Sequence, residues 1–238
     1  MKRILLLLII PIGLFAQSPN PPEEKLLNIE FASTRLKPEN LKDKYVNYDF
    51  SSLIFPKTKF LGYIGSQYRR IHIEYQSVKK NPIKSDEYKI EGYTIVGANK
   101  CDFKGYIRIE KIKELISFKY GVDDIYKDSL MQAQGVLLGR YYFEENENQN
   151  YVGVFKGIYK LYWYVDKSGS LRFDNIENYS DSYLNNQYTG TWTEYGKSKS
   201  KICNWGEYRI PNSRELDGGA GEFYPKSKYI EFGWQDYK

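Results

Sequence analysis

From about residue 59 onward, the chain alternates apolar and polar residues with a period of two. Residues 70–75 alternate isoleucine or tyrosine with charged residues, and residues 103–109 repeat this pattern. Successive side chains of a strand point to opposite faces, so the period predicts half-buried strands. Further strands are predicted at residues 88–96, 136–143, 152–165, 171–173 and 229–234.

Short turns rich in Gly, Asn, Asp and Pro separate these strands, as at residues 79–82, 97–100 and 166–169. Strand, tight turn and strand in succession predict an all-β fold, an antiparallel meander that closes into a barrel or a sandwich. Little helix is expected. A helical stretch or a loop is predicted around residues 124–132, a single helical turn at 37–43, and a loop leading into a strand at 49–55.

An aromatic-x-glycine pattern recurs four times along the predicted strands. Glycine inside a strand marks a bulge, a sharp bend or a close backbone approach. The aromatic residue two positions earlier lies on the same face and can cover the bare backbone. The repeated pattern predicts a strongly curled sheet. The copies are Phe60-Leu61-Gly62, Phe103-Lys104-Gly105, Phe155-Lys156-Gly157 and Tyr188-Thr189-Gly190.

The N-terminus has the layout of a secretory signal peptide over residues 1–16: a basic start, an apolar run and a cleavage point at Ala16-Gln17. Residues 17–58 are predicted to form an N-terminal extension. Residues 59–238 form a single β-rich domain, or two small halves that divide near 120–135. No second long apolar run follows, so the mature chain is not expected to be an integral helical membrane protein. We expect an exported protein that is periplasmic, on the cell surface or secreted.

Cys101 and Cys203 are the two cysteines. In an exported chain they form a disulfide, or they are two buried free thiols that behave as small apolar side chains. A disulfide between them would close a loop of about 100 residues, worth about 4–5 kcal/mol in the chain-entropy model.

The formal net charge is +5, and removal of Lys2 and Arg3 with the leader leaves +3. Acidic and basic residues are interleaved, so no nucleic-acid partner is expected. The cluster Lys197–Lys201 is predicted to be a solvated hairpin tip, and the acidic residues 144–150 another.

Two cysteines and one histidine do not supply a closed zinc site or a catalytic triad, and we expect no metal, cofactor or catalytic set. Carboxylate chemistry of the glycosidase kind would need two acids beside a groove. The acids available near the aromatic C-terminal segment are Glu207, Glu215, Asp217 and Glu222.

Tyrosine is unusually abundant, with 24 residues. Aromatic side chains supply flat, rigid contact area for a ligand, although each also fits a core. The ligand-binding candidates are Tyr162, Tyr164, Trp192 and Trp205, with Trp234 favoured for the core. We expect a non-catalytic exported module that binds a small ligand, a glycan or a protein partner in the cell envelope. The alternatives are a carboxylate-dependent hydrolase such as a glycosidase, and a structural envelope protein.

Residues 188–192, 202–211 and 219–223, with Phe60–Gly65 upstream, resemble those of uncharacterised exported β-rich bacterial proteins, over most of the mature chain. That group has no assigned activity, so the resemblance implies no catalytic residues. At the level of fold the chain is also similar to lipocalin-like small barrels, but the Gly-x-Trp of a first lipocalin strand is not present near residue 60. Fold similarity alone would not establish a function.

Overall fold

A computed structural model describes residues 35–181 and 183–237. Antiparallel strands make up 46% of the structure and helix 11%, and the strands form one strongly curled half-barrel sheet. The predicted all-β fold class is confirmed. The predicted signal peptide and residues 17–34 of the predicted extension lie outside the described residues.

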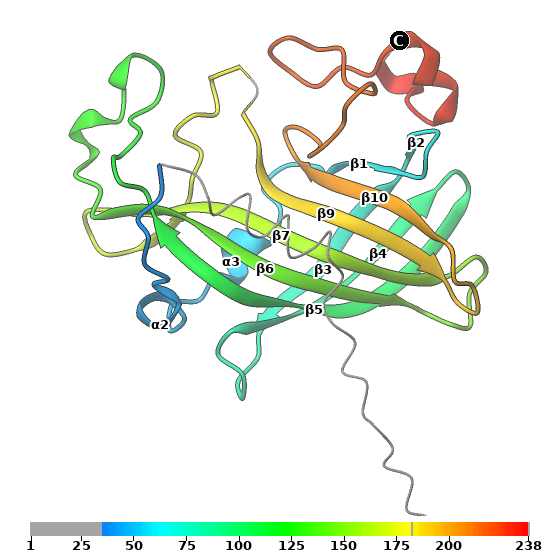
Figure 1. Cartoon of the computed structure of the whole chain (residues 1–238), viewed down its shortest axis with the longest axis horizontal. Coiled ribbons are helices and arrows are strands. Elements are labelled where there is room, and N and C mark those ends of the chain that lie inside the picture. Colours follow the sequence, from blue (N-terminus) through cyan, green and yellow to red (C-terminus); the bar gives the residue numbers. More distant parts are fainter. Residues whose placement is uncertain (1–34, 182, 238) are drawn as a thin grey trace, which may run out of the picture.

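Ten strands form the sheet, in the order β2-β1-β10-β9-β7-β6-β5-β4-β3, with β8 pairing separately with β7 (Figure 1). Every pairing is antiparallel, and the run from β3 to β7 is a meander of hairpins, as the turn spacing predicts. The strands are β1 (Leu61–Ile64), β2 (Arg69–Arg70), β3 (His72–Lys80), β4 (Glu87–Val96), β5 (Asn99–Glu114), β6 (Ala133–Glu145), β7 (Gly153–Val165), β8 (Leu171–Phe173), β9 (Asn185–Glu194) and β10 (Ser200–Glu207).

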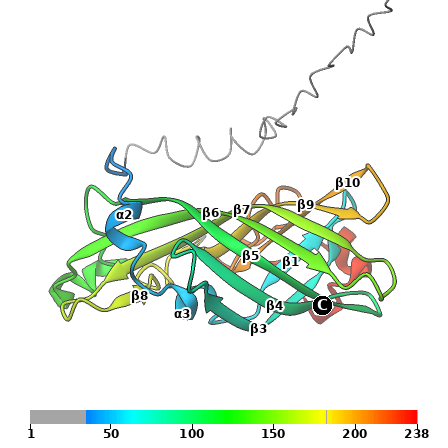
Figure 2. The same cartoon turned by 90° about the horizontal axis from the view of Figure 1, so that it is seen from below.

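Glycines of the recurring pattern lie where a side chain would collide with the neighbouring strand. Gly157 of β7 lies opposite Gly190 of β9, and a Cβ at Gly157 would lie 2.2 Å from the carbonyl oxygen of Thr189. A Cβ at Gly105 would lie 2.7 Å from the ring of Phe143 on the next strand. These glycines permit the tight curl seen in Figure 2.

Aromatic side chains fill the middle of the half-barrel. The rings of Tyr188 and Trp205 are stacked with centroids 4.6 Å apart, and Tyr141 packs edge-on against both. Such offset and edge-to-face contacts add to the apolar area that the rings bury. The buried aromatic residues at this level are Phe60, Tyr75, Phe103, Tyr141, Phe143, Phe155, Tyr159, Tyr188 and Trp205.

One end of the half-barrel is closed by two short helices, α2 (Lys42–Tyr45) and α3 (Ser51–Ile54). Tyr45 and Phe50 pack on Trp163, and Tyr45 also donates a hydrogen bond to Glu114. The described part of the predicted N-terminal extension therefore belongs to the core of the domain. The prediction of a loop and strand at residues 49–55 was wrong, because the backbone amides of Leu53 and Phe55 close helical turns there.

The C-terminal segment covers the outer face of β1 and β2. It contains the 3₁₀ helices η3 (Ser227–Phe232) and η4 (Gln235–Tyr237), so the predicted strand at 229–234 was wrong. Its apolar side chains pack outside the barrel against Tyr63 and Tyr68, and Trp234 is fully buried in that cluster. The edge of β1 is already paired with β2 at Tyr63 and Ile64.

The β5–β6 connection contains the 3₁₀ turns η1 (Val122–Asp124) and η2 (Lys127–Ser129), so around 124–132 the loop alternative is closer than the regular helix. Asp123, Asp124 and Leu130 have φ of 54°, 55° and 52°, a left-handed conformation that interrupts a right-handed helix. β5 and β6 pair directly with each other on either side of this connection, as neighbours in one sheet.

Candidate functional site

The other end of the half-barrel has a hollow of about 770 Å³, here called the mouth. It lies where the β4–β5, β6–β7 and β9–β10 hairpins come together, at the end away from α2 and α3 (Figure 1). Small-molecule sites are typically about 300–1,000 Å³, so the mouth suits one compact ligand. Its lining is Ile64, Gly65, Ser66, Gln67, Arg69, Ile71, Thr94, Val96, Asn99, Cys101, Glu145, Tyr151, Phe155, Trp192, Lys199 and Lys201.

The inner wall of the mouth is apolar. Phe155 and Trp192, which lie opposite each other on β7 and β9, have ring centroids 6.4 Å apart. Ile71 closes the wall from the opposite edge of the sheet, and all three side chains are buried. Below them the aromatic layer fills the barrel, so a ligand would rest on packed rings and would not pass through.

One buried carboxylate lines the mouth. Glu145, at the end of β6, is 4% exposed. It accepts hydrogen bonds from the hydroxyl of Thr94 at 2.6 Å, from Nε1 of Trp192 at 2.8 Å and from the amide of Gly153 at 3.0 Å. Burial outweighs these donors and raises the pKa of Glu145 above its usual range.

Glu145 was not singled out from the sequence, because it stands in an acidic run that predicts a solvated hairpin tip. The β6–β7 turn does fall there, but Glu145 precedes it and continues the inward-facing series of Tyr141 and Phe143. Inward positions recur every second residue, so counting two residues on from Phe143 would have indicated an inward Glu145.

Three basic residues surround the opening: Arg69 after the β1–β2 turn, and Lys199 and Lys201 at the start of β10. The ammonium of Lys201 lies 4.9 Å from the centre of the Trp192 ring. Within the ranges 35–181 and 183–237, none of the three forms an ion pair with a carboxylate. These exposed positive charges at the opening favour the approach of an anion.

The two cysteines are free and buried in this structure, so the disulfide considered from the sequence is not formed. Cys101 lines the mouth beside Asn99, whose side-chain amide lies 3.0 Å from its sulfur, whereas Cys203 is enclosed in the core. They lie on β5 and β10, with β6, β7 and β9 between these strands in the sheet. Burial raises the pKa of both thiols, which leaves them in the unreactive protonated form.

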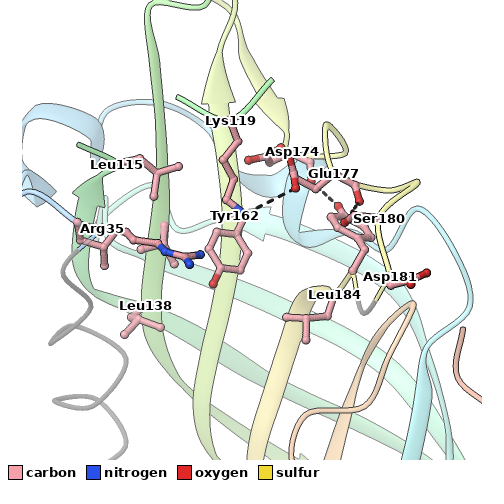
Figure 3. Close-up of a pocket in the computed structure, with 13 residues that line it drawn as sticks. Arg35, Leu115, Lys119, Leu138, Tyr162, Asp174, Glu177, Ser180, Asp181 and Leu184 are labelled. Atoms are coloured by element: carbon pink, nitrogen blue, oxygen red, sulfur yellow. Dashed lines mark hydrogen bonds and ion pairs between the residues drawn. The ribbon is translucent and has the colours of Figure 1, made fainter. Parts of the chain in front are cut away.

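The four aromatic candidates from the sequence lie in different places. Trp192 lines the mouth, and Trp205 is 1% exposed within the aromatic layer. Tyr162 and Tyr164 point to the outer face of β7, where both are half-buried. Tyr162 lines a second hollow of about 600 Å³ on that face, here called the outer groove (Figure 3).

Three of the four acids considered for hydrolytic chemistry make structural contacts. Glu207 is fully buried and accepts hydrogen bonds from the amides of Lys57 and Thr58 at 2.7 and 2.6 Å and from Nδ2 of Asn186 at 2.7 Å. It fixes the segment that leads from α3 into β1. Asp217 pairs with Arg209 at 3.1 Å, Glu215 pairs with Lys228 at 2.8 Å, and Glu222 is exposed.

Two features are absent from the described residues. No group of three or more His, Cys, Asp or Glu side chains in that part of the chain is arranged to hold a metal ion. No helix there has the length and apolar character needed to cross a membrane.

Comparison of the chain with protein-family models, with curated proteins and with solved structures found no match. Function is therefore inferred from the residues of the mouth themselves.

Proposed function

We propose that the protein is a non-catalytic binding module that holds one small apolar anion in the mouth of its half-barrel. The observation that carries the proposal is the pairing of an apolar wall, Phe155 and Trp192, with three basic groups that have no carboxylate partner in the described chain. From the predicted signal peptide we infer that ligand capture takes place outside the cytoplasm.

The ligand's chemistry follows from the positions of these groups. An aromatic or aliphatic body would cover the apolar side chains that line the mouth, which is favourable in proportion to the apolar area covered. A carboxylate, sulfonate or phosphate would remain at the opening, within reach of Lys199, Lys201 and Arg69. These cations are exposed, so each contributes modestly to the affinity.

The alternative of a carboxylate-dependent hydrolase draws no support from the acids in question. Retaining and inverting glycosidases need two carboxyl groups on either side of one substrate site. Glu145 is the one carboxylate in the lining of the mouth, and Glu207 is fully buried with its oxygens engaged. The structural-protein alternative would be favoured by large, stable homo-oligomers in solution.

A suitable probe is 8-anilinonaphthalene-1-sulfonate, an aromatic anion whose fluorescence rises in an apolar site. The mature chain, residues 17–238, is expected to bind the probe with one-to-one stoichiometry. The bound probe should quench the fluorescence of Trp192. Replacing Lys199 and Lys201 together with glutamine should weaken binding about tenfold, which corresponds to about 1.4 kcal/mol.

The matched control replaces Lys104 and Lys197 with glutamine. Both are exposed lysines that do not line the mouth, so binding should remain within about twofold of the wild type. Equal loss of binding in the two double variants would mean that the probe responds only to net charge, and would contradict a site at the mouth.

A further inference from the structure

Three aromatic side chains of the described chain line the mouth, and they differ in exposure. Phe155 and Trp192 are 2% and 6% exposed, whereas Tyr151 is 77% exposed. The two buried rings are already covered by the protein itself. The ring of Tyr151 is therefore the aromatic surface that a ligand in the mouth can cover most fully.

The backbone at Tyr151 is in an unfavourable conformation. Its φ of 54° lies in the left-handed region, which glycine adopts freely and asparagine more readily than a bulky residue. The preceding β6–β7 turn contains three asparagines, Asn146, Asn148 and Asn150, yet the left-handed position is occupied by tyrosine. The conformational preference of the turn thus does not account for a tyrosine at residue 151.

Hydrogen bonds fix the turn that presents Tyr151 to the mouth. Oε1 of Gln149 accepts a hydrogen bond from the amide of Asp102 at 2.8 Å, and the carbonyl oxygen of Asn150 accepts one from Nδ2 of Asn99 at 3.1 Å. These contacts join the β6–β7 turn to the start of β5. A side chain that is placed before the ligand arrives loses less conformational freedom on binding.

The fold makes little use of the Tyr151 side chain. Within the described part of the chain it forms no hydrogen bond, ion pair or ring contact. A side chain so exposed adds little to stability through burial of apolar area. Backbone strain at such a position is typical of residues that contact a ligand.

We propose that Tyr151 is the specificity-determining residue of the mouth and selects anions with an aromatic body over aliphatic anions. This inference rests on the proposed function and narrows its ligand class. The ligand's ring packs on the ring of Tyr151 in an offset or edge-to-face arrangement, which adds to the apolar area that both bury. Its acidic group faces Lys199 and Lys201. An aliphatic anion gains the burial but not the contact between rings.

Tyr151→Asn in the mature chain, residues 17–238, tests this contact, because asparagine tolerates the left-handed conformation and has no ring. Isothermal titration calorimetry should show about tenfold weaker binding of 8-anilinonaphthalene-1-sulfonate and a change of less than about threefold for octane-1-sulfonate. Tyr151→Phe keeps the ring and should bind the aromatic anion within about threefold of the wild type. The matched control is Tyr179→Asn, a tyrosine 76% exposed and outside the lining, which should stay within about twofold.

Stability gives a second measurement. The urea unfolding midpoint of Tyr151→Asn should equal or exceed that of the wild type, because the variant relieves strain and removes no packing. A clearly lower midpoint would show that the tyrosine serves the fold, and would overturn the proposal. Equal weakening for the two anions, or no weakening for either, would overturn it and leave the proposed function in place. A wild-type protein that binds neither anion would overturn both.

Discussion

Glu145 occupies an inward position of β6 where the preceding inward residues, Tyr141 and Phe143, are aromatic. A buried carboxyl group is costly unless its oxygens find donors, and Glu145 finds three. None of these donors is a cation, which explains why burial prevails and the pKa rises. The hydroxyl of Thr94 can donate or accept, so the network satisfies both the ionised and the protonated side chain.

Glu145→Gln is expected to reduce the dependence of stability on pH. Because the folded-state pKa lies above the ordinary value of 4.5, the protonated group stabilises the fold fully below about pH 4.5. That contribution is lost as the pH rises through the folded-state pKa. Glutamine keeps the three contacts without titrating, so the variant should gain thermal stability relative to the wild type between pH 5 and pH 8.

Thermal unfolding of both proteins across that pH range gives the measurement. Glu207 and Asp174 also have raised pKa values, but they are present in both chains, so the difference isolates Glu145. The control is Glu144→Gln at the exposed neighbouring position, which should run parallel to the wild type. A uniform loss of stability in Glu145→Gln at every pH would show that an ionised carboxylate is required.

At the level of elements, most strands were predictable, with the segment 229–234 as the exception, and the helices were not. The predicted segments 88–96, 152–165 and 171–173 match β4, β7 and β8 closely, because alternation is a local property of strands. α2 and α3 are four residues each and have no side-chain caps, so their helical form depends on packing against Trp163 and Tyr88. No local pattern encodes that contact.

Phe50→Ala is expected to destabilise the protein by about 3–5 kcal/mol, the usual cost of deleting a fully buried phenylalanine. Phe50 lies between the helical segment and Trp163, so its loss leaves a cavity at the closed end of the half-barrel. The control is Phe55→Ala, five residues later and 40% exposed, which should cost less than about 1 kcal/mol. The two variants are compared by their midpoints of urea unfolding. Equal shifts of the midpoint from the wild type would mean that residues 42–55 are not part of the cooperative core.

The whole molecule is a half-barrel that is filled in its middle, closed by α2 and α3 at one end and open at the other. Composition and turn spacing predicted a barrel-like sheet, but not which aromatic residues line an opening. Trp192 and Trp205 illustrate this limit: both face inward, on β9 and β10, at different heights of the same interior. Height in a barrel depends on strand register and tilt, which a single sequence does not give.

The exposed cations at the open end predict that the affinity for an anionic ligand depends on salt concentration. The cations at the mouth are exposed, and the range of their field falls from about 10 Å at 0.1 M salt to about 3 Å at 1 M. Affinity for 8-anilinonaphthalene-1-sulfonate should therefore fall about three- to tenfold between 50 mM and 500 mM NaCl. N-phenyl-1-naphthylamine, which has the same apolar body without the charge, should bind with unchanged or slightly higher affinity, because salt strengthens apolar burial. Fluorescence titration of both probes measures the contrast, and parallel salt dependence would mean that the basic rim does not contact the ligand's charge.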